Sequence, residues 1–473
     1  MKTKCPAVTP FRFTLIILYI IFTAWVYTLY TRSVNFRHHF QRGFLYPRIK
    51  GWKWVAMDNF TNFTQTWRED IDIKTWEEFK NHPTALKKTT TEDPKDPGRS
   101  TAGIQINKAL LNQTEPKPST IPPSDQRALT VIPVMFKKNF KMMPYWELNG
   151  VYLRGEEAFQ TVCAESLRKS KNEDFQKAFI PNIKMYLYQN QLNLSEWNRL
   201  SHFNNPFGFM EYNYTDIKSA VDLIQKPNIT QLLPLPANES CIRCAVVANG
   251  GILNGSKMGK EIDSHTYVFR MNGAVIEGHE EDVGNRTSVY VHTSFSLIAS
   301  LIAYRKYGFK NVPNDEGIKF VMIPEGLRDF IFLKDLLNRK AGPDRDFKKK
   351  KRAWAYYGGQ FDESRFYVLH PDFLRYIRNR FMTSKQQNGT YWAMYRPTNG
   401  AFTLFLALHV CDIVDAYGFI TENHKSFSNY YYENKKTEVV FFINHDYNLE
   451  IKLWKKLHDD KLIRLYQREG GQT

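Results

Sequence analysis

Cysteine is scarce in this sequence: five occur among 473 residues, at Cys5, Cys163, Cys241, Cys244 and Cys411. Cys241 and Cys244 form a Cys-x-x-Cys pair, but the chain has no second pair to complete a four-cysteine zinc site. The pattern therefore predicts no metal site. In an oxidising compartment the four later cysteines would instead form two disulfides, and their spacing leaves three pairings open.

Acidic residues are outnumbered by basic ones, 48 to 65, which gives a formal net charge of +17. A surplus of this kind favours acidic partners, namely nucleic acid, anionic lipid or a negatively charged small substrate, and does not choose among them. Two Asp-x-Asp pairs, Asp70–Asp72 and Asp344–Asp346, end no predicted strand. We interpret both pairs as surface charge and not as metal ligands.

The clearest long run without charge spans Phe13–Tyr30, which is ~27 Å long as a helix. Trp25 and Tyr27 lie toward its far end, where aromatic residues favour the membrane interface. A cleaved signal peptide is the alternative. The run is bulky, however, and no small-x-small cleavage site follows it. The pattern favours an uncleaved transmembrane signal-anchor.

Ten Asn-x-Ser/Thr sequons follow this run, and none has proline at its middle position. They begin at Asn59, Asn62, Asn112, Asn193, Asn213, Asn228, Asn238, Asn254, Asn285 and Asn388. Their placement predicts a single-pass type II protein whose bulk is lumenal. That location argues against nucleic acid as a partner, despite the basic run Lys348–Arg352.

The composition divides the chain into four parts. Residues 1–12 are a cytosolic tail and residues 13–30 are the anchor. Residues 31–134 form a stem that we expect to be largely disordered, because much of it is rich in Pro, Thr, Ser and Lys. Residues 135–473 have a globular composition and form the lumenal domain, in which we find no internal repeats.

Three predicted strands in this domain each stop near a small polar residue. They are Cys244–Ala248 before Asn249, Thr266–Arg270 before Asn272, and Ser288–Val291 before Thr293. Glycines follow Asn249, so we expect a turn that approaches a ligand closely, and then a helix. The carboxyl edge of an open α/β sheet binds ligands, although small polar residues are also common in ordinary turns.

Later segments continue the alternation of strand and helix. Strands are predicted at 318–323, 366–369 and 413–419, a buried helix at 401–411, and an amphipathic helix around 449–457. This alternation predicts an α/β fold with a mainly parallel sheet that is covered by helices on both faces.

Polar residues accompany these later elements. Thr398 or Asn399 can cap the buried helix, whose amino end would then attract a phosphate or a carboxylate. A run of tyrosines begins at Tyr430, and His445 lies where a loop meets a helix. A histidine there can act as a general base, although a lone histidine is more often structural.

Four segments, in this order, resemble the motifs of animal sialyltransferases. Cys244–Thr293 resembles their large motif, Thr398–Phe419 the small motif, Tyr430–Glu433 the third motif, and His445–Glu450 the very small motif. The stretches CIRCAVVANGG, YRPTNGA, AYGFIT and NHDYNLE are most similar to the subfamily that adds sialic acid α2,6 to N-acetylgalactosamine (GalNAc) on Ser/Thr-linked glycans.

The resemblance implies a GT-A-like variant (Rossmann-type) fold with a seven-stranded sheet. It implies CMP-sialic acid as the donor, no metal or other cofactor, inversion at the anomeric carbon, and an O-glycosylated glycoprotein as acceptor. It also implies attachment to the Golgi membrane. The preferred acceptor glycan, bare GalNAc or Galβ1,3GalNAc, stays open.

The resemblance also assigns residues. Donor-binding positions are Asn249, Asn272, Thr293, Thr398, Asn399, Gly400 and Tyr430, with His445 as the catalytic base and Glu450 and Tyr431 in support. Cys244 pairs with Cys411, which leaves Cys163 with Cys241. The chain departs from the family pattern at Thr293, often Asn in the family, at Asn429, His in some members, and at Ile451, Lys in some members and here followed by Lys452.

The predicted mechanism has His445 take the proton of the acceptor C6-hydroxyl as that oxygen attacks C2 of sialic acid. Two other functions stay open. One is a sialyltransferase of another linkage, α2,3 to galactose or α2,8 to sialic acid. The other is a non-catalytic, membrane-anchored glycan-binding protein on a decayed transferase fold, which the presence of His445 and Asn272 disfavours.

Overall fold

The computed structural model describes residues 130–155, 160–227, 232–338, 353–359 and 361–469. All of them belong to one compact unit, Lys95–Thr473. The predicted tail, the anchor, nearly all of the stem and both Asp-x-Asp pairs lie outside the described residues. None of the helices in the described part is long and apolar enough to cross a membrane.

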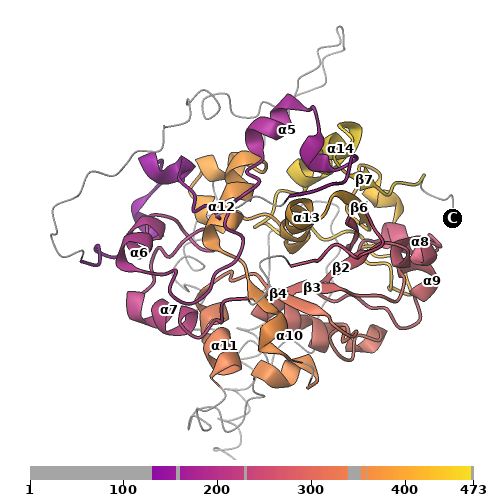
Figure 1. Ribbon diagram of the computed structural model, residues 1–473, viewed down its shortest axis with the longest axis horizontal. Coiled ribbons are helices and arrows are strands. Elements are labelled where there is room, and N and C mark those ends of the chain that lie inside the picture. The colour runs from indigo at the N-terminus through magenta and orange to yellow at the C-terminus, as the bar shows by residue number, and fades with distance from the viewer. Residues whose placement is uncertain (1–129, 156–159, 228–231, 339–352, 360, 470–473) are drawn as a thin grey trace, which may run out of the picture. The chain divides into compact units, whose positions relative to one another are not determined.

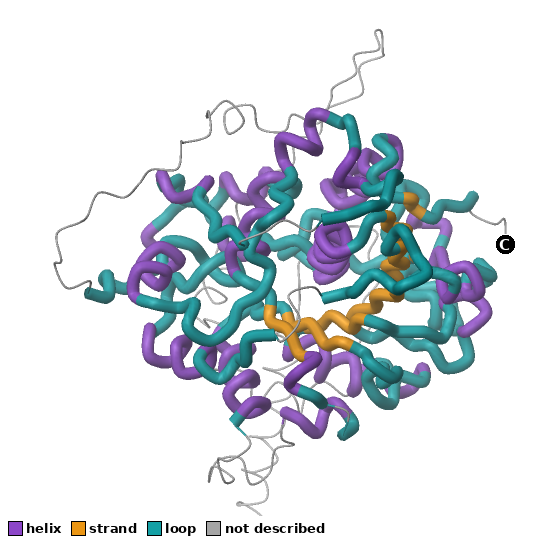
Figure 2. Tube along the Cα trace, in the orientation of Figure 1, coloured by secondary structure: helices purple, strands orange, loops and turns teal. Residues whose placement is uncertain are grey.

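The described chain contains a seven-stranded sheet in which all strand pairs are parallel. The strands are β1 (Arg243–Val247), β2 (Tyr267–Met271), β3 (Val289–His292), β4 (Lys319–Met322), β5 (Phe366–Val368), β6 (Ile413–Tyr417) and β7 (Arg464–Leu465). Their order across the sheet is β5-β4-β3-β2-β1-β6-β7. Figure 2 shows the strands as one band with helices on either side. The prediction of a parallel seven-stranded sheet is confirmed.

Helices connect the strands and also precede the sheet in the chain. The α-helices of the described part are α5 (Glu173–Ala178), α6 (Leu194–Leu200), α7 (Tyr214–Val221), α8 (Gly259–Asp263), α9 (Glu280–Val283), α10 (Ser294–Ala303), α11 (Leu327–Leu337), α12 (Pro371–Arg380), α13 (Asn399–Val410) and α14 (Tyr447–Asp459).

The strand order decides which face each helix covers. From β1 to β5 the chain steps in one direction across the sheet, and β6 and β7 then continue from β1 in the opposite direction. Because parallel crossovers are right-handed, helices of the two halves pack on opposite faces. Figure 1 shows α10 and α11 on one side of the sheet and α12 and α13 on the other. The direction reverses between β1 and β6, and α/β sheets bind ligands at the carboxyl end of such a point.

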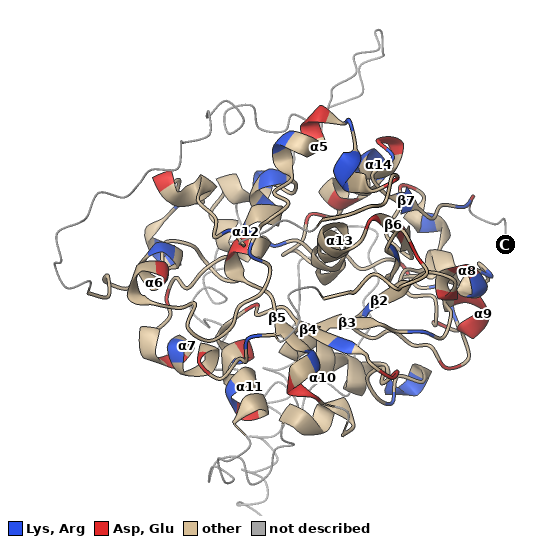
Figure 3. Cartoon of the chain, viewed as in Figure 1, with Lys and Arg blue, Asp and Glu red and all other residues tan. Residues whose placement is uncertain are grey.

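Helix α13 forms the centre of the core. It carries no Lys, Arg, Asp or Glu (Figure 3), and its residues from Ala401 to Val410 are all buried. It packs against β1, β2, β3 and β6. An apolar surface on all sides is what a helix between a sheet and other helices requires, so the predicted buried helix is confirmed.

The turn and the later helix that were predicted after β1 are both present. A 3₁₀ turn, Gly251–Leu253, follows the strand, and α8 begins only at Gly259. Gly250, Gly251 and Gly255 lie in this stretch, and glycine disfavours an α-helix by about 1 kcal/mol relative to alanine. The glycines therefore keep the segment as a turn.

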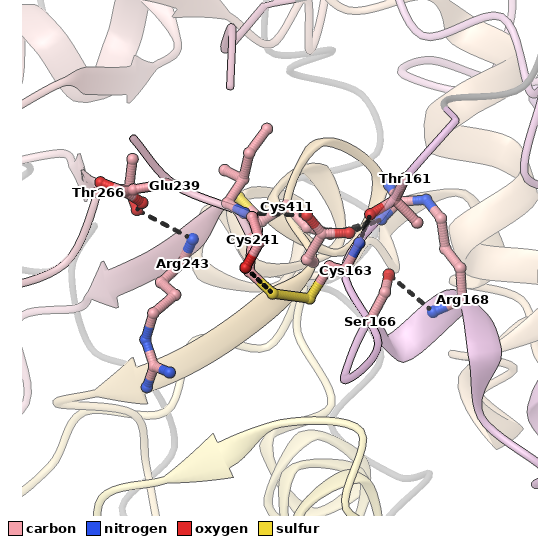
Figure 4. The surroundings of a disulfide bond; sticks show 12 residues. Thr161, Cys163, Ser166, Arg168, Glu239, Cys241, Arg243, Thr266 and Cys411 are labelled. Carbon is pink, nitrogen blue, oxygen red and sulfur yellow. Dashed lines mark hydrogen bonds and ion pairs between the residues drawn. A yellow bond between two sulfur atoms is a disulfide. The ribbon is translucent and has the colours of Figure 1, made fainter. Parts of the chain in front are cut away.

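The two disulfides have the predicted pairing. Cys163 bonds to Cys241 and joins the segment ahead of α5 to the start of β1, and Figure 4 shows this bond with Cys411 close by. Cys244, within β1, bonds to Cys411, the residue that ends α13. Cys244 and Cys411 are fully buried. Both bridges lie toward the amino ends of β1 and β6, opposite the expected site.

Candidate active site

Asn249 follows β1 at the point where the sheet order reverses. Its Nδ2 donates to the carbonyl of Met271, at the end of the neighbouring strand β2, over 3.3 Å. Its Oδ1 is buried and accepts no hydrogen bond within the described residues. Buried polar atoms are nearly always paired, so this oxygen is suited to accept a hydrogen bond from a ligand.

Asn272 follows β2 and joins the sheet edge to α13. Its φ of 52° lies in the left-handed region, which asparagine adopts more readily than most residues. Its Oδ1 accepts from Nδ2 of Asn399, the first residue of α13, at 2.9 Å. Two predicted donor-binding residues that are 127 positions apart therefore contact one another.

The amino end of α13 provides a seat for an anion. Thr398 is the N-cap residue, and its Oγ1 accepts from the backbone N–H of Ala401 at 3.1 Å. The N–H groups of Asn399 and Gly400 have no hydrogen-bond partner in the part of the chain that is described. Unpaired N–H groups and the positive end of the helix dipole together attract phosphate or carboxylate groups.

Gly400 lies between the ends of β2 and β6. A Cβ added there would meet Met271 and Phe419 at 3.7 and 3.6 Å, which are ordinary van der Waals distances. The protein's own packing therefore does not require glycine at this position. The bare Cα leaves room beside the two unpaired N–H groups, as a bound anion would need.

Gly250 and Gly251, in the turn after β1, are required by packing within the protein and not by the predicted approach to a ligand. A Cβ on Gly250 would lie 2.4 Å from the carbonyl oxygen of Gly418, and one on Gly251 would lie 2.0 Å from that of Ser428. These residues let three backbone segments of the protein pack together. The expectation that this turn serves chiefly to approach a ligand is thus not needed to explain its glycines.

The tyrosine run lies over the turn after β1. Tyr430 forms an isolated β-bridge with Gly250, and the N–H of Tyr431 donates to the carbonyl of Asn249 at 3.2 Å. The hydroxyl of Tyr430 accepts from that of Tyr304 at 3.1 Å. Burial raises the pKa of Tyr430 above its ordinary value, so the hydroxyl stays protonated and can act as a donor.

His445 lies two residues ahead of α14, at the loop-to-helix junction that was predicted. Its Nδ1 is 2.8 Å from the carbonyl oxygen of Arg396. Because a carbonyl can only accept, Nδ1 carries the hydrogen, and Nε2 holds the free lone pair in the neutral ring. Burial lowers the pKa of His445 to about 4, and the charge of Arg396 acts in the same direction. The imidazole is therefore a neutral base over the physiological pH range.

Arg396 and Glu325 form an ion pair beside this histidine. The guanidinium Nε and the carboxylate Oε1 are 3.0 Å apart, and a second nitrogen donates to Oε2 at 3.2 Å. Glu325 lies three residues after the end of β4. The pair fixes the segment whose carbonyl orients His445. Neither residue was singled out from the sequence, although the position of Glu325 after a predicted strand was a usable signal.

Glu450 ties α14 to the amino end of α13. Its Oε1 and Oε2 accept from the backbone N–H and the hydroxyl of Thr398, both at 2.9 Å. The side chain is 4% exposed, and burial raises its pKa to about 7. Glu450 thus supports the turn that carries Thr398 and Asn399.

Replacing Glu450 with alanine should destabilise the protein by about 1–3 kcal/mol, because the N–H and hydroxyl of Thr398 lose a buried acceptor. Glu450→Gln keeps one acceptor oxygen and should cost less. The pKa of Glu450 is higher in the folded protein than in the unfolded chain. Its titration therefore adds to the free energy of unfolding fully below about pH 4.5, and this contribution is lost as the pH rises through 7. Urea unfolding at pH 5 and pH 8 measures both effects. An identical pH dependence in the native protein and Glu450→Gln would contradict this assignment.

Thr293 differs from the other predicted site residues. It is the N-cap of α10, its Oγ1 accepts from the N–H of Ser296 at 2.9 Å, and it is 1% exposed. Its hydroxyl is thus engaged in capping a helix, and the structure provides no sign of a free polar atom there.

Three of the other predicted residues, His445, Glu450 and Asn272, contact the short segment from Arg396 to Gly400. The carbonyl of Arg396 holds His445, the N–H of Thr398 meets Glu450, and the amide of Asn399 meets Asn272. The imidazole, Asn272 and Asn399 are therefore linked through this one segment. Among the described residues, no group of three or more His, Cys, Asp or Glu side chains is arranged to hold a metal ion.

Comparisons with known proteins identify the family of this chain. The family model for glycosyltransferase family 29 (sialyltransferase) matches residues 186–462, more than half of the chain. The alpha-N-acetylgalactosaminide alpha-2,6-sialyltransferase 1 of Homo sapiens is 44% identical over 377 residues, which cover 78% of this chain and 63% of that protein. The alpha-N-acetylgalactosaminide alpha-2,6-sialyltransferase 2 of Mus musculus is 41% identical over 308 residues, or 64% of this chain and 82% of that protein.

More distant relatives and solved structures are also similar. The CMP-N-acetylneuraminate-beta-galactosamide-alpha-2,3-sialyltransferase 2 of Mus musculus is 30% identical over 48% of this chain and 58% of that protein. A crystal structure of a mammalian sialyltransferase matches with a TM-score of 0.47 and 21% identity, over 66% of this chain and 100% of that one. With the family model and the relatives taken together, this chain belongs to glycosyltransferase family 29, the sialyltransferases.

Proposed function

We propose that the protein transfers sialic acid from CMP-sialic acid to C6 of GalNAc that is O-linked to Ser or Thr of a glycoprotein. The single observation that carries the proposal is the convergence of His445, Asn272 and Asn399 on one turn. Identity to the alpha-2,6 relatives reaches 44%, against 30% for the alpha-2,3 relative in mouse, which favours the α2,6 linkage.

The donor contributes two anionic groups, a phosphodiester and a carboxylate. The N–H groups of Asn399 and Gly400 at the amino end of α13 can bind one of them without a basic side chain. The buried Oδ1 of Asn249 can accept from a donor group of the nucleotide. The hydroxyl of Tyr430 can donate to phosphate or ribose.

His445 acts as the base. Its Nε2 takes the proton of the acceptor C6-hydroxyl while that oxygen attacks C2 of sialic acid from the face opposite the phosphate. The new C2–O6 bond forms, the C2–O bond to CMP breaks with its electron pair, and CMP leaves as a phosphate monoester. The configuration at C2 is inverted. The leaving phosphate is already acidic, so no residue needs to protonate it.

The cellular setting follows from the same proposal. Residues 13–30 anchor the protein in the Golgi membrane, residues 31–134 form the stem, and residues 135–473 form the lumenal catalytic domain. The acceptor is an O-glycosylated glycoprotein. No metal ion or nucleic acid takes part.

Incubating the full chain, extracted from membranes with detergent, with CMP-sialic acid and a GalNAc-Ser/Thr glycopeptide tests the function. We expect release of CMP and a product with one added sialic acid, which linkage analysis assigns as α2,6. Transfer to galactose or to sialic acid instead would establish another linkage. Binding of the glycan without any release of CMP would establish a non-catalytic protein.

A further inference from the structure

Large apolar side chains are exposed on three segments next to His445. They are Met142, Tyr145, Tyr391, Met394, Phe442 and Ile443, with exposures of 54, 63, 48, 42, 55 and 63%. We name these six residues the apolar rim. Scattered single apolar residues are common on protein surfaces, whereas a group of them beside a candidate site indicates a binding surface.

The rim residues lie on three segments, 142–145, 386–396 and 442–445, and hydrogen bonds hold these segments against one another. The N–H of Met143 donates to the carbonyl of Gln387 at 2.9 Å, which joins the first segment to the second. The N–H of Arg396 donates to the carbonyl of Asn444 at 3.0 Å, which joins the second to the third. The three segments are therefore neighbours in the fold, although they are about 250 and 50 positions apart in the chain.

One of these segments also contains the candidate base. Phe442 and Ile443 lie three and two positions before His445 in the sequence. The side chain of Gln386 donates to the carbonyl of His445 at 3.4 Å, from the segment that carries Tyr391 and Met394. Two of the three rim segments are therefore tied to the backbone at His445, which places the rim beside the candidate base.

We infer that the apolar rim binds the polypeptide that carries the acceptor sugar. The inference rests on the proposed function, in which the acceptor is a GalNAc attached directly to Ser or Thr. Only one sugar ring then separates the C6-hydroxyl at His445 from the peptide backbone, so the flanking residues must lie against the rim. The rim acts on the affinity for the acceptor and not on the chemical step.

The composition of the rim indicates which polypeptides it binds. Three of its six side chains are aromatic: Tyr145, Tyr391 and Phe442. Aromatic surfaces recognise Pro-rich segments in the polyproline II conformation, which are extended before binding and lose little entropy. The preferred acceptor is therefore an extended peptide in which proline flanks the glycosylated Ser or Thr.

The double variant Phe442→Ser/Ile443→Ser tests the inference. Both side chains are more than half exposed, so the substitution should leave the fold intact. We expect KM for a Pro-rich GalNAc glycopeptide to rise about 10-fold, with kcat and KM for CMP-sialic acid unchanged. The rise should shrink for GalNAc-serine, which lacks a flanking peptide, and for a glycopeptide whose prolines are replaced by glycine.

Ile302→Ser is the matched control. Ile302 is 49% exposed near the end of α10, a helix that begins at the carboxyl edge of the sheet and runs away from it. This variant should leave every KM unchanged. An unchanged glycopeptide KM in the double variant would overturn the inference. So would loss of self-association or of vesicle binding as its only effect, since the rim would then bind a second copy or a membrane.

The proposed function and this inference can fail separately. Absence of transfer to any acceptor by the unaltered protein would overturn both. Transfer with equal KM values for GalNAc-serine and the glycopeptide, in the unaltered protein and in the double variant, would overturn the inference alone.

Discussion

Replacing His445 with alanine should lower kcat/KM for sialic acid transfer by about 10²–10⁴-fold, the contribution of a positioned general base. The ring is held through Nδ1 by the carbonyl of Arg396, so its Nε2 is the basic atom that is lost. KM for CMP-sialic acid should change little, because the donor is assigned to Asn249, Asn272 and the amino end of α13. Initial rates with both substrates varied separate the two effects.

His458→Ala is the control for this variant. His458 lies in α14 and its Nδ1 accepts from the N–H of Leu465 at 3.2 Å, so it resembles His445 in making a backbone hydrogen bond but takes no part in the site. It should retain normal turnover. A folded His445→Ala protein with near-normal turnover would refute the role of the base.

The pH profile provides a second test of the same residue. The pKa of His445 is lowered to about 4 by burial, so the ring stays neutral well below the ordinary histidine value of 6.5. The acid limb of kcat/KM should therefore fall near pH 4 and not near 6.5. The lowered pKa of His445 also affects stability. Its contribution to the free energy of unfolding is full above pH 6.5 and declines as the pH falls toward 4. An acid limb centred at 6.5 that persists in Glu450→Gln would contradict the lowered pKa.

Removing the Cys244–Cys411 disulfide should have the largest effect on stability. The bridge joins residues 167 positions apart, and closing a loop of that length in the unfolded chain corresponds to about 5 kcal/mol. Cys244→Ala/Cys411→Ala should therefore unfold at a much lower urea concentration. Its kcat/KM below the unfolding transition should stay close to normal, because the bridge lies at the amino ends of β1 and β6, away from Asn249 and His445.

Cys163→Ala/Cys241→Ala provides the comparison. This bridge spans 78 positions. By the same relation, its removal lowers the free energy of unfolding by only about 0.7 kcal/mol less than removal of the Cys244–Cys411 bridge. Cys163, Cys244 and Cys411 are fully buried and only Cys241 is partly exposed, so truncating the Cys244–Cys411 pair leaves the larger cavity in the core. Equal midpoints for the two double variants would show that core packing around the buried pair adds nothing.

The strands and α13 were predictable because their patterns are local. Short runs of apolar residues predict buried parallel strands, and six of the strands lie within two residues of their predicted bounds. The exception, β7 (Arg464–Leu465), is only two residues long, too short to leave a pattern. Helix α13 was predicted at 401–411 and extends from Asn399 to Val410, since Thr398 caps it and an unbroken apolar run fills it.

The candidate site was predictable only in part. Asn249, Asn272, Thr398, Asn399 and His445 each follow or begin an element whose boundary is visible in the sequence. The hydrogen bond of Glu325 with Arg396 and the capping role of Thr293 were not visible, because each depends on a neighbour or a geometry that sequence spacing does not fix. The glycines after β1 were visible, but the backbone they make room for was not.

By itself the sequence determined the order of strands and helices, the polar residues at their ends and the family motifs, because these depend on residues close together in the chain. The tertiary structure alone decided that Asn272 meets Asn399, that the carbonyl of Arg396 sets the tautomer of His445, and that three distant segments make one apolar rim. These contacts form only when the strand order reverses beside β1 and brings the carboxyl edge of the sheet, the start of α13 and the loop before α14 to the same place.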